Sequence, residues 1–189
     1  IFAFAAIACE GLSPFIRQYT FMNNAVANAF LINLGIKYKI KRFVYTSSMA
    51  VYGRGQVPFS EDLLPNPIDT YGIAKYAVEQ DLEAAGRFFG LNYTIVRPHN
   101  VFGIYQNIWD KYRNVIGIWI RQTLSGQPIT VYGDGQQVRS FSDINYYMEP
   151  FEKLMSCGDR DTFNIGADSH ISIIDAAKAF KNFLLPLSI

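Results

Sequence analysis

Short runs rich in β-branched and aromatic residues alternate along the chain with longer segments whose apolar residues recur at helical spacing. This alternation is typical of a parallel sheet covered by helices, because a chain must cross over before it can add another parallel strand. We predict strands at residues 1–8, 42–48, 92–97, 129–132, 138–144 and 162–165, and helices at 18–39, 70–90, 111–125, 145–157 and 172–184. The sequence therefore predicts an α/β fold.

The segment 70–90 carries the clearest helical pattern. Its apolar residues form one stripe, and Glu79, Glu83 and Arg87 are expected on the opposite face. Gly90 stands where a helix usually ends with a glycine cap. After the strand that ends at Ser48, Pro58, Pro65 and Pro67 predict a loop that leads to this helix.

Composition and charge exclude several classes of protein. Hydrophobic residues make up 50% of the 189 residues, charged residues make up 17%, and the formal net charge is +1. A disordered chain would have fewer apolar residues and more net charge. A protein that binds nucleic acid or a membrane surface would favour an excess of cations, so neither nucleic acid nor a membrane is expected as a partner. The most apolar stretch, residues 1–9, is far shorter than the roughly 20 residues that span a bilayer. With no recognisable signal peptide, a cytoplasmic location is expected.

Cysteine and histidine are scarce and scattered. Cys9 and Cys157 are the two cysteines, and His99 and His170 are the two histidines. Neither pair has metal-ligand spacing, so we expect buried thiols, no disulfide and no metal site.

Tyr71 and Lys75 lie four residues apart at the start of the 70–90 helix, so their side chains are expected on one face. A phenol is a poor proton shuttle at neutral pH, but a neighbouring ammonium favours the phenolate and lowers the phenol pKa. The pair is therefore a candidate acid/base site. The spacing alone is weak support, and a packing role for Tyr71 at the start of its helix is the alternative.

Three motifs strengthen the candidate site by their order and spacing. The strand at 42–48 ends in hydroxyls at the edge where parallel sheets bind ligands, and it opens the run Thr-Ser-Ser-Met-Ala-Val-Tyr-Gly at 46–53. Tyr-Gly-Ile-Ala-Lys follows at 71–75 and Arg-Pro-His-Asn-Val-Phe-Gly at 97–103. Together they resemble the extended short-chain dehydrogenase/reductase family of the NAD-dependent epimerase/dehydratase type, closest to nucleotide-sugar epimerases like UDP-glucose 4-epimerase.

The resemblance implies a partial Rossmann-type, doubly wound parallel sheet with part of a smaller substrate-binding α/β domain. Residues 1–98 would belong to the dinucleotide-binding domain and 99–189 mostly to the substrate-binding portion, with a return to the sheet near 138–157. The glycine-rich first turn that approaches the pyrophosphate in such folds does not occur in this sequence. We therefore expect the chain to be a fragment of a longer enzyme, shortened at both ends and inactive alone.

By the same resemblance, the cofactor is NAD and the substrate a nucleotide sugar, with a UDP-hexose epimerised at C4 through a transient 4-keto intermediate. Ser48, Tyr71 and Lys75 would be catalytic. Ser48 has a structural alternative as a strand-end cap, Asn24 as a surface amide and Arg139 as a salt-bridge residue. The implied cofactor-binding residues are Ala5, Ala6, Asn24, Ser47, Tyr71, Lys75 and Pro98, and the implied substrate-binding residues are Ser48, Asn100, Asn114, Val115, Tyr132 and Arg139.

Residues beside the first motif help to separate reactions within the resembled family. Dehydratases of this type carry an Asp-Glu pair where this chain has Met49 and Ala50, neither of which titrates. Epimerisation is thus favoured over water elimination. The alternatives are a nucleotide-sugar reductase or another epimerase of this type, or a non-catalytic dinucleotide-binding relative. Helices 18–39 and 70–90 resemble those that pair subunits in the family, so a homodimer is expected.

Overall fold

The structure is a computed structural model that describes residues 1–54 and 57–184. The chain packs as two compact units. The first comprises Ile1–His99 and Tyr146–Ile165, and the second comprises Asn100–Asn145 with the described residues from Gly166 onward. The assignment of 1–98 to a dinucleotide-binding domain and of 99–189 to a substrate-binding portion remains a proposal.

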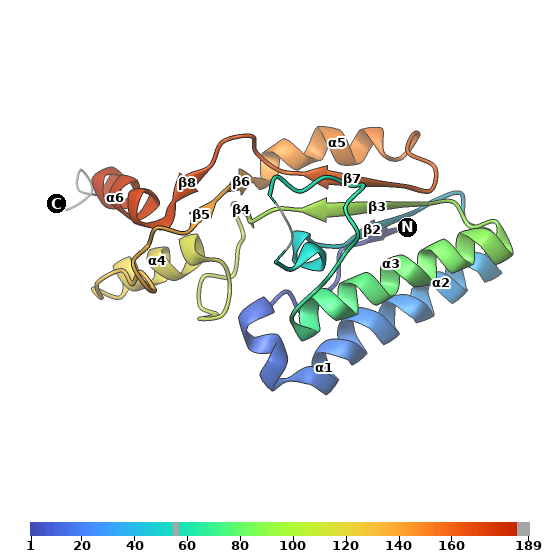
Figure 1. Cartoon of the computed structure of the whole chain (residues 1–189), viewed down its shortest axis with the longest axis horizontal. Helices are drawn as coiled ribbons and strands as arrows, with labels where there is room; N and C mark the ends of the chain where they lie inside the picture. Colours follow the sequence, from blue (N-terminus) through green and yellow to red (C-terminus); the bar gives the residue numbers. More distant parts are fainter. Residues whose placement is uncertain (55–56, 185–189) are drawn as a thin grey trace. The chain divides into compact units, whose positions relative to one another are not determined.

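A four-stranded, fully parallel sheet forms the centre of the first unit, in the order β1-β2-β3-β7 (Figure 1). This confirms the predicted α/β fold. The first predicted strand is much shorter than expected, because the backbone after it is bonded at Ile7 to the side chain of Asn24 instead of to a neighbouring strand. The strands are β1 (Phe2–Ala3), β2 (Phe43–Thr46), β3 (Tyr93–Pro98) and β7 (Asp161–Ile165).

Helices cover both faces of this sheet (Figure 1). On one face lie α2 (Ala27–Lys37) and α3 (Thr70–Phe89). On the other lies α5 (Met148–Lys153), which follows a short helical turn, η4 (Ile144–Tyr147), and packs Phe151 against the rings of Phe2 and Phe4. The core beneath α3 is built from Ile32, Phe43, Tyr45, Val78, Leu82, Ala85, Tyr93 and Ile95.

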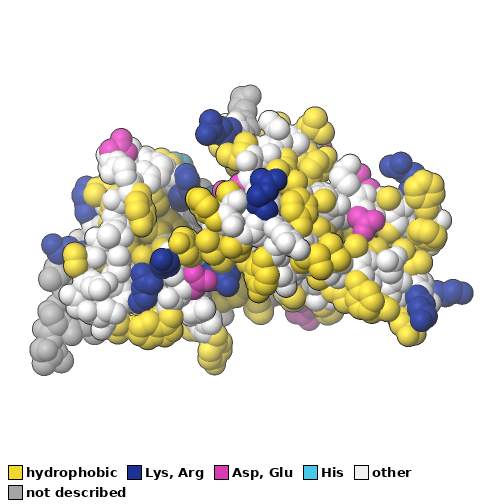
Figure 2. Space-filling model, turned by 90° about the horizontal axis from the view of Figure 1, so that it is seen from below, with side chains coloured by type: hydrophobic (Ala, Val, Ile, Leu, Met, Phe, Trp, Pro, Cys, Tyr) yellow, Lys and Arg dark blue, Asp and Glu magenta, His cyan; other side chains and the backbone are white. Residues whose placement is uncertain are grey.

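The helix predicted at 18–39 is interrupted by a π-helical turn. A 3-10 turn, η1 (Glu10–Phe15), leads into α1 (Arg17–Phe21), the π turn η2 (Met22–Val26) and α2. The face turned inward is polar, with Thr20, Asn24 and Asn28 at most 2% exposed. The face turned outward is apolar, with an outer stripe of residues that are each more than half exposed (Figure 2): Tyr19, Met22, Val26 and Phe30.

The helix α3 begins and ends where the sequence predicted. The Asp69 carboxylate accepts a hydrogen bond from the Gly72 amide at 2.9 Å, and Gly90 closes the helix with a φ of +69°. Glu79 contradicts the prediction, because it is 1% exposed instead of lying on the solvated face. Its carboxylate is turned toward a buried cation, Arg97.

The connection from β2 to α3 is a loop that contains one 3-10 turn, η3 (Met49–Tyr52). Gly53 ends this turn with a φ of +62°, and a Cβ there would lie 2.0 Å from the Asn66 carbonyl oxygen. Only glycine fits both restraints. In its described residues the predicted loop is thus correct except for the turn that follows Ser48, and residues 55–56 of the predicted loop lie outside the described residues.

The second unit contains two small ladders. β4 (Val101–Phe102) pairs in parallel with β6 (Ser142–Asp143), and β5 (Val138–Arg139) pairs antiparallel with β8 (Ile171–Ser172). Trp119 of α4 (Val115–Leu124) packs with Ile173 and Ala177 of α6 (Ile173–Leu184).

The strand predicted at 129–132 is wrong, although the segment is held firmly. The Trp119 indole donates to the Thr130 carbonyl at 2.8 Å, and the Gln122 amide group bonds the backbone and the hydroxyl of Thr130. Side chains of α4 therefore form the backbone hydrogen bonds that a neighbouring strand would otherwise have formed. The strand propensity of residues 129–132 does not show which partner their backbone finds.

Two further sequence expectations concern thiols and membranes. Cys9 is buried as expected, but Cys157 is exposed, because it lies in the turn after α5. Neither forms a disulfide. Among the described residues, no helix combines the length and the apolarity needed to cross a membrane.

Candidate active site

Tyr71 and Lys75 share one buried face of α3 near the end of β2. The Lys75 ammonium donates a 2.6 Å hydrogen bond to the carbonyl of Thr46, which is the last residue of β2. It also lies 5.8 Å from the centre of the Tyr71 ring and 5.0 Å from that of Tyr45. Tyr71 and Lys75 are 8% and 2% exposed. The structure thus brings together the two groups that the spacing had placed on one face.

Ser48 joins this pair from the turn that follows β2. Its hydroxyl accepts a hydrogen bond from the Ala50 amide at 3.1 Å and so caps η3, as its structural alternative foresaw. It also interacts with the Tyr71 hydroxyl, an interaction that lowers the pKa of Tyr71. Capping and contact with Tyr71 therefore coexist, because a hydroxyl can accept and donate at once.

The start of α3 is fixed from a distant part of the chain. The Ser13 hydroxyl accepts a 3.0 Å hydrogen bond from the Tyr71 amide and lies 3.3 Å from the Asp69 carboxylate that caps the helix. Ser13 is itself 1% exposed. The backbone that carries Tyr71 is therefore tied both to its own helix cap and to η1.

The proton affinity of Tyr71 differs from the sequence expectation. Burial raises the pKa of Tyr71 to about 12, while its interaction with Ser48 lowers it and the charges of Glu10 and Asp69 raise it. The expectation that Lys75 would bring this pKa below its ordinary value is wrong. Desolvation of a phenolate outweighs a neighbouring amine that is itself buried and bonded to a carbonyl.

Lys75 shows the complementary shift. Burial lowers the pKa of Lys75 to about 8, and the negative charge of Glu79 opposes this effect. Both shifts favour the neutral form, as expected where water is excluded. At neutral pH the site therefore holds a protonated phenol and an ammonium that is close to titrating.

A buried polar network that was not predicted from the sequence lies next to Lys75. The Arg97 guanidinium on β3 binds both carboxylate oxygens of Glu79, at 3.1 and 2.6 Å. The Ser47 hydroxyl donates to the same carboxylate, and Tyr52 accepts a 2.6 Å bond from Arg97. The signal was present, because a charged residue that ends a buried apolar strand requires a buried partner of opposite charge.

The residues predicted to bind the cofactor divide into inner and outer groups. Asn24 is fully buried, so its alternative as a surface amide is wrong; its carboxamide bonds the Ile7 amide at 2.8 Å and the Ile7 carbonyl at 3.2 Å. Ser47 is also buried. Pro98 ends β3, Ala5 is exposed and Ala6 is half-buried in the segment after β1. A cofactor role for each remains a prediction.

The residues predicted to bind substrate in the second unit also differ in accessibility. Asn114 caps α4 by accepting from the Gly117 amide, and it donates to the Val101 carbonyl at 2.7 Å. Asn100 donates from its side chain to the Ser140 carbonyl at 3.0 Å. Tyr132 is 78% exposed, Arg139 is exposed on β5, and Val115 is half-buried at the start of α4. Substrate contact by this set remains a prediction.

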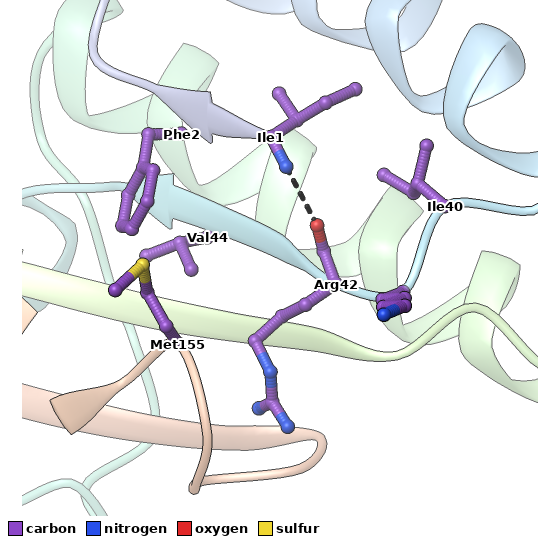
Figure 3. Close-up of a pocket in the computed structure, with 7 residues that line it drawn as sticks. Ile1, Phe2, Ile40, Arg42, Val44 and Met155 are labelled. Carbon is purple, nitrogen blue, oxygen red and sulfur yellow. Dashed lines mark hydrogen bonds between the residues drawn. The ribbon is translucent and has the colours of Figure 1, made fainter. Parts of the chain in front are cut away.

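The described residues offer no cluster of three His, Cys, Asp or Glu side chains that could hold a metal ion. None of Ser48, Tyr71 and Lys75 lines the pocket of about 210 Å³ whose lining residues are drawn in Figure 3. The pocket adjoins the amino ends of β1 and β2, where the Ile1 amino group donates to the Arg42 carbonyl at 2.8 Å, whereas Ser48 follows the carboxyl end of β2. The pocket is lined by Ile1, Phe2, Ile40, Lys41, Arg42, Val44 and Met155.

Comparison with known proteins finds relatives both in sequence and in structure. A dTDP-D-glucose 4,6-dehydratase of Dictyostelium discoideum is 27% identical over 173 residues, which are 85% of this chain and 39% of the relative. The crystal structure of a UDP-glucose 4-epimerase from Thermotoga maritima with UDP-glucose has a TM-score of 0.91 and 31% identity, covering 96% of this chain and 59% of that one. A UDP-glucuronic acid 4-epimerase from Bacillus cereus in complex with NAD has a TM-score of 0.86 and 26% identity, covering 96% and 58%.

The chain thus spans between 39% and 59% of the length of these proteins. The family model for the NAD dependent epimerase/dehydratase family matches residues 1–166, which include all three sequence motifs. Its match covers most of the chain, and the structural likeness extends over both described units. The chain belongs to the NAD dependent epimerase/dehydratase family.

Proposed function

We propose that the whole protein is an NAD-dependent nucleotide-sugar epimerase that inverts C4 of a UDP-hexose through a transient 4-keto intermediate. The observation that carries this proposal is the buried contact of Tyr71 and Lys75 beside Ser48 at the carboxyl end of β2. The epimerases among the structural relatives support the choice of reaction, and the complexes of such relatives with UDP-sugars and with NAD support the ligands.

The polar groups around Lys75 suit a cofactor with hydroxyl groups. An ammonium has three donors, and among the described residues the one acceptor bonded to Lys75 is the Thr46 carbonyl. The Thr46 hydroxyl oxygen is buried, with no hydrogen-bond partner in the described part of the chain. We therefore assign Lys75, with Tyr71, to the ribose of the nicotinamide. When bound, NAD supplies the hydride acceptor and donor of the reaction.

The residues of this chain would move the proton. The cycle begins with Tyr71 as the phenolate, a form that the Lys75 ammonium stabilises against the effect of burial. The phenolate takes the proton from the sugar hydroxyl as that carbon is oxidised, holds it while the ketone exists, and returns it when the ketone is reduced, while Ser48 holds the sugar oxygen against Tyr71. Because Tyr71 gains and then returns one proton, no second acid or base is needed for inversion.

The turn after Ser48 favours epimerisation over dehydration. Met49 and Ala50, the first residues of η3, carry no titratable group, so these two positions offer neither an acid nor a base for removing water. A reductase would use the same Ser48, Tyr71 and Lys75, and the sugar contacts would distinguish it. The presence of Ser48, Tyr71 and Lys75 together argues against a non-catalytic relative.

We assign the nucleotide end of the substrate to the second unit. Arg139 presents an exposed guanidinium, whose planar fork of donors suits the diphosphate. Tyr132 presents an exposed ring that suits a nucleobase. Asn100 and Asn114 already bond the backbone, so they would act mainly by shaping the site.

We also propose that the whole protein is a homodimer. The outer stripe of Tyr19, Met22, Val26 and Phe30 gives one continuous apolar face on α1, η2 and α2. A second copy of the same face would remove these side chains from water.

The Tyr71→Phe variant tests the proposed reaction. It removes the transferable proton and keeps the ring, so turnover of UDP-glucose to UDP-galactose by the full-length protein should fall at least about 10²-fold. NAD binding, measured by calorimetry, should persist. Tyr76→Phe on the same helix is the matched control and should keep full activity. Equal turnover in Tyr71→Phe and the wild type would refute the assigned role.

A further inference from the structure

A buried ion pair lies one helical turn beyond Lys75 and has no part in the proposed proton transfer. The side chains of Glu79 and Arg97 are 1% and 6% exposed. Arg97 bonds the carboxylate through Nε at 3.1 Å and through a terminal nitrogen at 2.6 Å. Such a two-pronged bond fixes the direction of a carboxylate as well as its position.

The pair is tied to the segment that carries Ser48. The Ser47 hydroxyl donates to Glu79, and Ser47 stands between Thr46, whose carbonyl receives the Lys75 ammonium, and Ser48, which contacts Tyr71. The Ser47 amide in turn donates to the Val96 carbonyl at 2.7 Å. Glu79 therefore fixes Ser47, and the residues on both sides of Ser47 contact candidate catalytic groups: Thr46 contacts Lys75, and Ser48 contacts Tyr71.

The opposite end of the pair is tied to the rest of the sheet. The Tyr52 hydroxyl accepts from Arg97 at 2.6 Å and donates to the Asn164 side chain of β7 at 2.9 Å. The Arg97 guanidinium also lies 4.7 Å from the centre of the Tyr52 ring. The carboxylate of Glu79 is thus clamped between α3, β2, β3 and β7.

We propose that Glu79 is a positioning residue for Lys75: clamped by Arg97, it fixes Ser47 and hence the Thr46 carbonyl that receives the ammonium, and it supplies the negative charge that keeps this ammonium protonated. The proposal rests on the proposed function, since it assigns Glu79 to the same reaction. Glu79 touches neither substrate nor cofactor in this scheme and acts through Lys75.

Charge balance inside the unit supports this role. Lys75 and Arg97 are two buried cations, and Glu79 is the buried carboxylate near both. The other titratable groups that face Lys75 are the phenols of Tyr45 from β2 and Tyr71 from α3, which carry no charge at neutral pH. A buried ion pair contributes little stability over apolar residues of similar size, so stability alone gives weak reason for one here.

The experiment follows the protonation of Lys75 directly in the full-length protein. Lysine side chains are labelled with ¹⁵N, the Lys75 signal is identified by its loss in Lys75→Met, and its titration is recorded by NMR. Glu79→Gln keeps the shape of the side chain and removes its charge. The double variant Glu79→Leu with Arg97→Met removes both charges and should stay folded.

In Glu79→Gln the titration midpoint of Lys75 should fall by about one pH unit or more, as expected for losing a nearby opposite charge while Arg97 remains. In the double variant the fall should be smaller, because the like charge of Arg97 is lost as well. Arg97→Lys keeps the Glu79 charge but not the two-pronged clamp, so it should keep the midpoint and lower kcat. Leu82→Ala is the control for destabilisation of the core and should lower Tm without moving the midpoint.

A wild-type midpoint in Glu79→Gln, or a wild-type kcat in Arg97→Lys, would show that the pair is only structural. A fall in Arg97→Lys as large as in Glu79→Gln would show that the Glu79 charge is not the cause. Because the NMR titration needs no turnover, it is independent of the Tyr71→Phe test. Failure of the epimerase proposal would appear as a wild-type protein without activity on UDP-hexoses, whatever the Lys75 midpoint.

Discussion

Burial, more than neighbouring charge, sets the proton affinities of the two central side chains. It raises the pKa of Tyr71 to about 12 and lowers that of Lys75 to about 8. A sequence shows that a tyrosine and a lysine share a helix face, but it does not show how much water reaches them. The pairing could therefore be predicted from residue spacing, and the direction of the Tyr71 shift could not.

The lowered pKa of Lys75 predicts opposite effects of pH on activity and on stability. Activity should fall as pH rises through about 8, because the ammonium that supports Tyr71 is lost. Stability should rise between about pH 8 and 10, since the unfolded chain binds the Lys75 proton more tightly than the folded chain does; the whole effect reaches about 3 kcal/mol if complete.

This prediction is checked by urea denaturation of the full-length protein between pH 7 and 10, alongside the pH profile of kcat. The Lys75→Met variant provides the reference, because its stability should lack the rise that Lys75 contributes. Above pH 10 the raised pKa of Tyr71 should lower stability again, because the folded state resists forming its phenolate. Identical stability profiles in the two proteins below pH 10 would contradict the assignment.

At the scale of single elements, prediction succeeded where the determining signal is local. The bounds of α3 follow from Asp69 and Gly90, which are adjacent to the helix they cap. The burial of Glu79 escaped prediction because its partner, Arg97, stands on another element. The segment 129–132 escaped for the same reason, since its backbone is bonded by side chains of α4.

The cap of α3 should contribute to stability and to the position of Tyr71. Replacing Asp69 with Ala removes the acceptor for the Gly72 amide and should lower the free energy of unfolding by about 1 kcal/mol. Asp69→Asn retains a good cap and should lose much less. Urea denaturation of both variants checks this, and equal losses would show that the carboxylate charge, not the cap, is what matters.

At the scale of the whole molecule, the segment from α1 to the start of α2 departs from the usual pattern of apolar residues inside and polar residues outside, before Ile32 of α2 joins the core. Thr20, Asn24 and Asn28 face inward, and the outer stripe faces outward. The apolar spacing in the sequence predicted the helix, but it did not reveal which side meets the sheet. The polar inner side is satisfied in part by bonds such as that of Asn24 to Ile7.

The outer stripe predicts how the full-length protein assembles. Val26→Asp with Phe30→Asp places two charges on this face and should convert a dimer into monomers, because each charge would have to leave water on pairing. Analytical ultracentrifugation measures the change. Leu124→Asp, at another exposed apolar position, is the control and should leave the dimer intact. A wild-type protein that sediments as a monomer would refute the assignment of this face.

The order of strands in the central sheet affects how the chain folds while it is being synthesised. β7 pairs with β3, yet residues 100–145 of the second unit separate them in sequence. A ribosome therefore releases β1, β2 and β3 well before the strand that closes their edge. Throughout that interval the outer backbone of β3 lacks its partner, so the nascent polypeptide exposes an unpaired strand edge at which mispairing with another strand can begin.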